Sequence, residues 1–88
     1  MSDQIMRDNL LTLAGAFARA RGWSMSTVSK KIHGKQDFFD LYQVGKTSTR
    51  VSHYWMMVDR FREMWPPGTP WPRTVPIGKL GKEVSDAK

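Results

Sequence analysis

The sequence has 88 residues, of which 40% are apolar, so it can bury the core of one small domain. It contains no cysteine, which excludes disulfide bonds and thiolate metal sites. Fourteen Lys and Arg residues against eight Asp and Glu give a net charge of +6, and such a surplus suits a nucleic acid or an anionic membrane surface.

The chain lacks the patterns of membrane insertion and secretion. No apolar run approaches the ~20 residues of a membrane span. The opening "MSDQIMRDNLL" is polar and acidic before it becomes apolar, which is unlike a secretory signal. We therefore expect a cytoplasmic protein without a membrane partner.

The first expected helix covers about residues 3–21. Its apolar side chains recur on one face at spacings of four, three and four, at Met6, Leu10, Leu13 and Phe17. Asp3 is the expected N-cap, and Gly22 is suited to end the helix in a left-handed conformation.

Two shorter helices are expected next. Ser24 can cap the first of them, at about residues 25–33, and Gly34 can stop it. The other covers about residues 37–44 and starts at Asp37. Its Phe38, Leu41 and Tyr42 share one side.

The fourth expected helix, about residues 50–65, has the strongest pattern. Ser48 or Thr49 is its expected cap, and Pro66-Pro67 ends it because proline cannot donate the next hydrogen bond. The apolar stripe contains Val51, Tyr54, Trp55, Val58, Phe61 and Trp65. Met57 and Met64 widen it to about half of the circumference, more than one packing face needs, so we expect these two residues to form a dimer surface.

Residues 66–88 contain all five prolines of the chain. We expect an extended arm that packs through Trp71 and becomes disordered from about Ile77. No strand-like alternation occurs anywhere. The sequence therefore predicts an all-α fold with one domain at residues 1–65 and an arm at residues 66–88.

A turn motif joins the first two expected helices. Ala18, Gly22 and Val28 follow one another at spacings of four and six. A small side chain at Ala18 allows two helices to cross closely, Gly22 accepts a positive φ, and Val28 can plug back into the first helix. Trp23 and Ile32 supply further buried anchors. Such an arrangement holds the second helix outward, where it can enter a major groove.

The segment "GWSMSTVSKKIHG" resembles the helix-turn-helix of the Lac repressor family, whose core reads G-V-S-x-x-T-V-S-R. Its closing "K-x-I-H" is similar to the Cro-type phage repressors. The resemblance covers residues 14–33 and implies a DNA-binding motif with a core of Ala18, Gly22, Val28 and Ile32. The residues after the motif show no resemblance to the sugar-binding domain of the Lac family.

The resemblance also implies roles for single residues. Met25, Ser26 and Lys30 stand where that family reads bases. Several polar and basic side chains would contact phosphates, namely Ser24, Thr27, Ser29, Lys31, His33 and Lys35.

We therefore expect sequence-specific binding of double-stranded DNA by a small, dimeric, nucleoid-associated regulator of bacterial or phage type. Two alternatives stay open, an excisionase-like or architectural DNA-binding factor and a protein–protein adaptor or antiactivator on the same scaffold. The two histidines have no paired carboxylates nearby, and no Ser-His-acid arrangement is visible. We thus expect no enzyme, metal, cofactor or small-molecule ligand.

Overall fold

Residues 2–75 are described by a computed structural model of the chain. They form α1 (Asp3–Arg21), α2 (Met25–Ile32), α3 (Phe38–Gln43) and α4 (Val51–Met64), and these described residues include no strand. The predicted all-α fold with four helices is confirmed. No helix within the described range has the length and apolar character to cross a membrane.

The start of α1 differs from the prediction by one residue. Ser2, not Asp3, is the N-cap, because its Oγ accepts a hydrogen bond from the N–H of Ile5 at 3.1 Å. Asp3 is the first residue of the helix, where its carboxylate favours the positive end of the helix dipole.

The starts of α3 and α4 lack side-chain caps. Asp37 precedes α3 but makes no capping hydrogen bond, and Arg50, rather than Ser48 or Thr49, precedes α4. Leu41 is 36% exposed, so it does not share the buried face of α3 with Phe38 and Tyr42 as expected. Phe39 is buried in its place.

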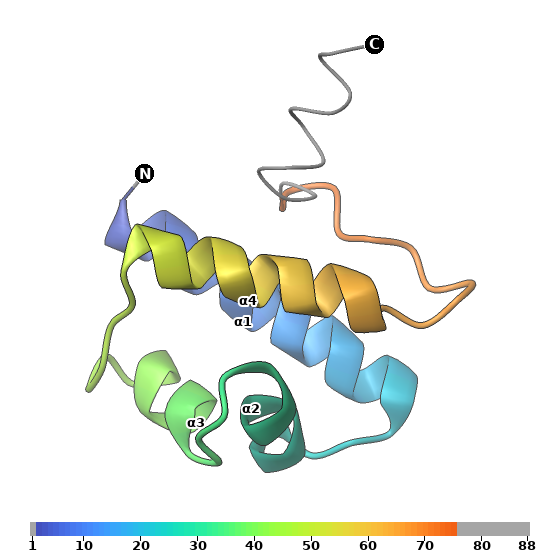
Figure 1. Cartoon of the computed structure of the whole chain (residues 1–88), viewed down its shortest axis with the longest axis horizontal. Coiled ribbons are helices and arrows are strands. Elements are labelled where there is room, and N and C mark those ends of the chain that lie inside the picture. Colours follow the sequence, from blue (N-terminus) through green and yellow to red (C-terminus); the bar gives the residue numbers. More distant parts are fainter. Residues whose placement is uncertain (1, 76–88) are drawn as a thin grey trace, which may run out of the picture.

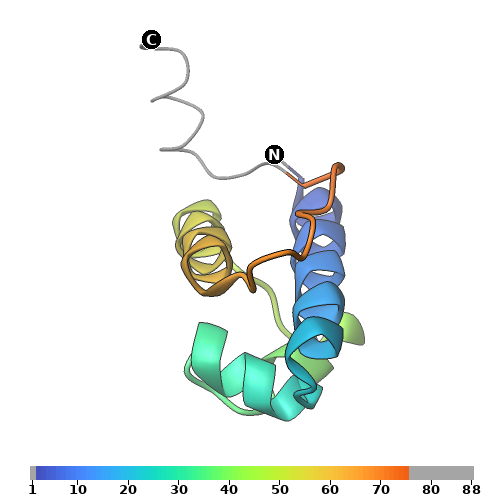
Figure 2. The same ribbon diagram turned by 90° about the vertical axis from the view of Figure 1, so that its right-hand side faces the viewer.

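Helices α1 and α4 lie alongside each other, and α2 and α3 lie together beneath them in Figure 1. Helix α4 packs against both α1 and α2. Figure 2 shows α2 below the pair formed by α1 and α4. The largest fully buried side chains come from all four helices, and include Leu10, Phe17, Ile32, Phe39, Tyr42, Tyr54 and Phe61.

The core contains edge-to-face aromatic pairs and a buried hydrogen bond between two side chains. Phe17 meets Phe61 at 5.5 Å between ring centroids. Asn9 donates from Nδ2 to the hydroxyl of Tyr54 at 3.0 Å, and this bond joins α1 to α4. Edge-to-face contacts of this kind stabilise a core beyond the apolar area that they bury.

The chain after α4 turns back over α1 and α4, on the side away from α2 (Figures 1 and 2). Trp65 and Trp71 pack at 4.9 Å between centroids, and the indole of Trp71 donates to the carbonyl of Val75 at 2.9 Å. Val75 itself is only 3% exposed and belongs to the core. The expected packing of the arm through Trp71 is confirmed, whereas the disorder expected from Ile77 concerns residues outside the described range.

Candidate functional site

The turn between α1 and α2 is short and fixed by backbone hydrogen bonds. Gly22 has the expected left-handed conformation, with φ 72°, and its N–H donates to the carbonyl of Ala18. The N–H of Trp23 donates to the same carbonyl at 2.9 Å. Trp23 is only partly buried, against the ring of Phe17 at 5.5 Å. The chain therefore reverses sharply before α2 begins.

Ser24 starts α2 as predicted. Its Oγ accepts a hydrogen bond from the N–H of Thr27 at 3.3 Å and lies 3.1 Å from the Thr27 hydroxyl. Ser24 is exposed at the surface while its side chain caps the helix. A serine at this position satisfies one of the N–H groups that a helix leaves unpaired at its start.

The inner face of α2 is apolar and packs against the rest of the molecule. Val28 and Ile32 are fully buried, and Ala18 on α1 is 9% exposed. These three residues occupy the core positions that the sequence predicts for them. With Gly22 in the turn, they fix how closely α2 approaches α1.

Ser29 is not available to a phosphate, contrary to the expectation. Its side chain is 1% exposed, and its Oγ accepts a hydrogen bond from the N–H of Phe39 at 3.0 Å. The reason is the position of α3, which lies across the side of α2 that carries Ser29. Ser29 thus joins α2 to α3 instead of facing outward.

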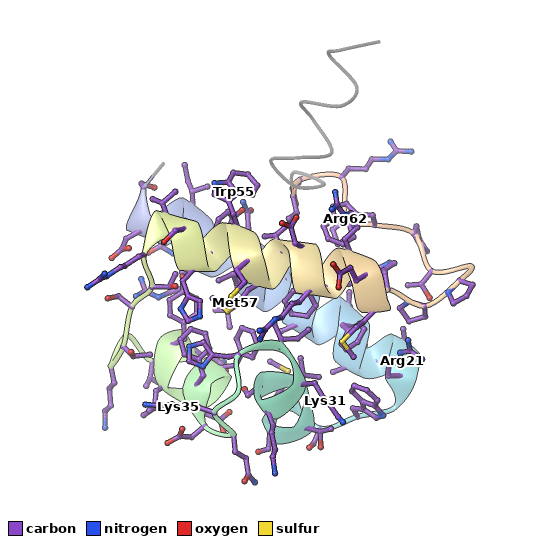
Figure 3. The ribbon with its side chains drawn as sticks, in the orientation of Figure 1. Arg21, Lys31, Lys35, Trp55, Met57 and Arg62 are labelled. Carbon is purple, nitrogen blue, oxygen red and sulfur yellow. The ribbon has the colours of Figure 1, made fainter. Side chains whose placement is uncertain are left out.

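The outer face of α2 carries two cations and no acid. Lys30 and Lys31 are exposed, and α2 contains no Asp or Glu. Ser26, Thr27, Lys30, Lys31 and Gln36 line a hollow of about 180 Å³ on this face. Lys35 is also exposed, and Figure 3 shows Lys31 and Lys35 on the same side of the molecule, with α2 and α3.

Met25 differs from the other predicted base-reading residues. Ser26 and Lys30 both line the hollow, whereas Met25 is partly buried against the hydrophobic core. The structure therefore places Ser26 and Lys30 together at the hollow, whereas the side chain of Met25 packs partly against the core.

His33 lies between helices. Its ring stacks on Phe38 at 3.8 Å with an angle of 4°, and its centroid is 4.8 Å from that of His53. Its Nδ1 is buried and has no hydrogen-bond partner among the described residues. Burial, followed by the charges of His53, Lys35 and Arg60, lowers the pKa of His33 below 6.5. A stacked imidazole with a lowered pKa is a weak partner for the phosphate contact expected of His33.

Two residues that contact or adjoin α2 escaped the sequence reasoning. Arg60 on α4 donates to the carbonyl of Ile32 at 2.7 Å, although the two residues are 28 positions apart in the sequence. This bond gives a partner to one of the carbonyl groups that a helix leaves unpaired in its last turn. Gln36 follows α2 and reaches the hollow on its outer face. No local pattern marks Arg60, but the polar loop before Asp37 could have drawn attention to Gln36.

Met57 does not form a dimer surface. Its side chain is 0% exposed, and Figure 3 shows it on the side of α4 that faces the other helices. The apolar arc of α4 is wide because this helix packs against both α1 and α2. Met64 is partly buried and packs against the core.

No family model matches the chain, and no curated protein or solved structure matches it.

Proposed function

We propose that the protein binds double-stranded DNA through the outer face of α2 and acts as a small transcription regulator. The observation that carries this proposal is the two-sided construction of α2. Its inner face holds Val28, Ser29 and Ile32 inside the molecule, while Lys30 and Lys31 extend outward from a helix without acidic residues. A helix exposed in this way suits the major groove, which is about 12 Å wide.

The polar groups on this face match the two kinds of contact that DNA recognition needs. Lys31 and Lys35 supply positive charge for phosphates, and phosphate contacts orient a protein on the duplex. Lys30 and Ser26 line the central hollow, where they can donate to base edges. The short reversal at Gly22 supports a helix-turn-helix, with α1 as the first helix and α2 as the recognition helix.

Recognition of a palindromic operator by a dimer requires two copies whose α2 helices lie about 34 Å apart. Sedimentation of the protein with and without a bound duplex tests for this dimer. A bend measured in the bound duplex would favour the architectural alternative over a regulator that only occupies its operator.

The proposal predicts binding that depends on salt and on the α2 lysines. Fluorescence anisotropy with labelled genomic duplexes should show log affinity falling steeply with log salt, by a slope of about −0.9 for each phosphate neutralised. Lys31→Ala should weaken binding to all duplexes and reduce that slope by about one, because it removes one phosphate contact.

Arg73→Ala is the matched control. Arg73 is exposed and belongs to the arm, which runs over α1 and α4 on the side away from α2 (Figure 1), so its loss removes the same charge without touching the proposed surface. A slope near zero for the wild-type protein, or equal losses for the two variants, would contradict a DNA surface on α2.

A further inference from the structure

We propose that Gln36 is a base-reading residue, which pairs with an adenine beside the base that Lys30 contacts. The inference rests on the proposed function and goes beyond it, because Gln36 lies outside α2 and outside the residues 14–33 of the motif. Four of the five residues that line the hollow come from α2, and Gln36 is the fifth.

The connection between α2 and α3 places Gln36 there. The N–H groups of His33 and Gly34 both donate to the carbonyl of Ser29, at 2.8 and 3.1 Å, and Gly34 has a φ of 103°. The chain thus reverses directly after α2. The loop returns along the helix, so Gln36 lies beside Lys30 and Lys31.

The loop is held at its far end as well. The N–H of Phe38 donates to the carbonyl of Lys35 at 3.3 Å, and the N–H of Phe39 donates to Ser29 Oγ at 3.0 Å. Because backbone bonds fix both sides of Gln36, a contact from its side chain loses little loop entropy on binding. Such preorganisation is what a residue that discriminates between ligands requires.

The chemistry of the hollow indicates what Gln36 adds. Lys30 and Lys31 can only donate, and the hydroxyl of Thr27 already pairs with Ser24 at 3.1 Å. Among the lining side chains, Gln36 alone carries an acceptor and a donor in one plane. That pair matches N6–H and N7 of adenine, whereas lysine matches O6 and N7 of guanine.

The size of the hollow favours a base edge over a small molecule. Its volume is about 180 Å³. Small-molecule pockets usually measure roughly 300–1,000 Å³ and enclose most of their ligand. The edge of a base pair in a groove needs only a shallow, polar surface, which the exposed side chains of this hollow provide.

The first step selects duplexes that the wild-type protein binds from a pool of random sequence. The second step measures the affinities of the wild-type protein and of Gln36→Ala for single-base variants of the selected site. We expect the variant to lose an adenine preference of about 5- to 150-fold at one position, while its affinity for unrelated duplexes and its salt slope stay the same. Gln36→Glu should move the preference at that position toward cytosine, because a carboxylate accepts from N4 of cytosine.

Gln43→Ala is the control, since Gln43 is an exposed glutamine on α3 that does not line the hollow. It should keep every base preference of the wild type. If Gln36→Ala keeps them too, or loses affinity equally for all sequences, the assignment of Gln36 is wrong while DNA binding stands. If the wild-type protein binds no duplex, the proposed function fails, and this inference fails with it.

Discussion

Tyr42 and Tyr54 are both buried phenols, but they have different hydrogen-bond partners. The hydroxyl of Tyr54 accepts from Asn9 at 3.0 Å, whereas that of Tyr42 has no partner among the described residues. Burial raises the pKa of Tyr42 to about 12, partly offset by the charge of Arg7. The hydroxyl of Tyr42 therefore carries a desolvation cost without a compensating bond.

This difference predicts opposite behaviour for two matched variants in urea unfolding followed by circular dichroism. Tyr54→Phe should lower the free energy of unfolding by about 1–3 kcal/mol, because the buried amide of Asn9 loses its acceptor. Tyr42→Phe should leave that free energy unchanged or raise it slightly. An equal loss in both variants would contradict the hydrogen bonding described for Tyr42.

The lowered pKa of His33 predicts a stability that depends on pH. Because its pKa in the folded protein lies below 6.5, the unfolded chain binds more protons than the folded one as pH falls through this range. Stability is thus highest above the ordinary pKa and is lost as pH decreases through 6.5 toward the lowered value.

We expect the free energy of unfolding to fall between about pH 7.5 and 5.5, before carboxylates titrate. His33→Phe should remove most of that fall, since phenylalanine can keep the stacking on Phe38 but carries no proton. His53→Gln should reduce the fall only in part, because the charge of His53 is a smaller cause of the shift than burial. The same fall in His33→Phe as in the wild type would exclude His33 as its source.

At the scale of the elements, the two glycines of α1 and its turn have different roles. Gly22 has a φ of 72°, whereas Gly15 lies inside the helix. A Cβ at either position would meet no heavy atom within 4 Å, so a substitution to alanine acts through the backbone alone. Alanine is strained in the left-handed conformation and favoured in a helix.

Gly22→Ala should therefore lower the free energy of unfolding by about 1–2 kcal/mol, while Gly15→Ala should raise it by about 0.5–1 kcal/mol. Gly22→Asn should cost less than Gly22→Ala, since asparagine tolerates the left-handed region better. Thermal and urea unfolding of the three variants measure these changes. A stable Gly22→Ala protein would show that the turn can adopt another conformation.

Short sequence patterns predicted the parts of the fold that are set by residues close together in the chain. Gly22 marks the end of α1 and Ser24 the start of α2. The burial of Val28 and Ile32 follows from their helical spacing. The errors about Ser29 and Met57 arose where a second helix covers a face that the local pattern leaves undefined. Ser29 is polar yet buried under α3, and Met57 is buried because α4 packs against two helices at once. The contact of Arg60 with Ile32 spans 28 positions, so no local pattern could show it.

At the scale of the whole molecule, the ends of the helices are tied to one another. Arg60 links α4 to the end of α2, and Arg21 donates from α1 to the carbonyl of Met64 at 2.7 Å. Figure 3 shows Lys31 and Lys35 on one side of the molecule and Trp55 and Arg62 on the other, beyond α4. The two sides differ in charge pairing, because Arg62 pairs with Asp59 at 3.5 Å whereas α2 contains no acidic residue.

The hydrogen bonds that hold α2 in place involve Ser24, Ser29 and Ile32. The side chains at positions 26, 30 and 31 make no hydrogen bond to other described residues. Those positions can be randomised in a display library without rebuilding the scaffold. Because the sequence contains no cysteine, such a library can be expressed in reducing cells and, under the proposed function, sorted for binding to new DNA sequences. Under the proposed function, variants of this library would differ in DNA preference through three side chains of α2 alone, on an otherwise unchanged scaffold.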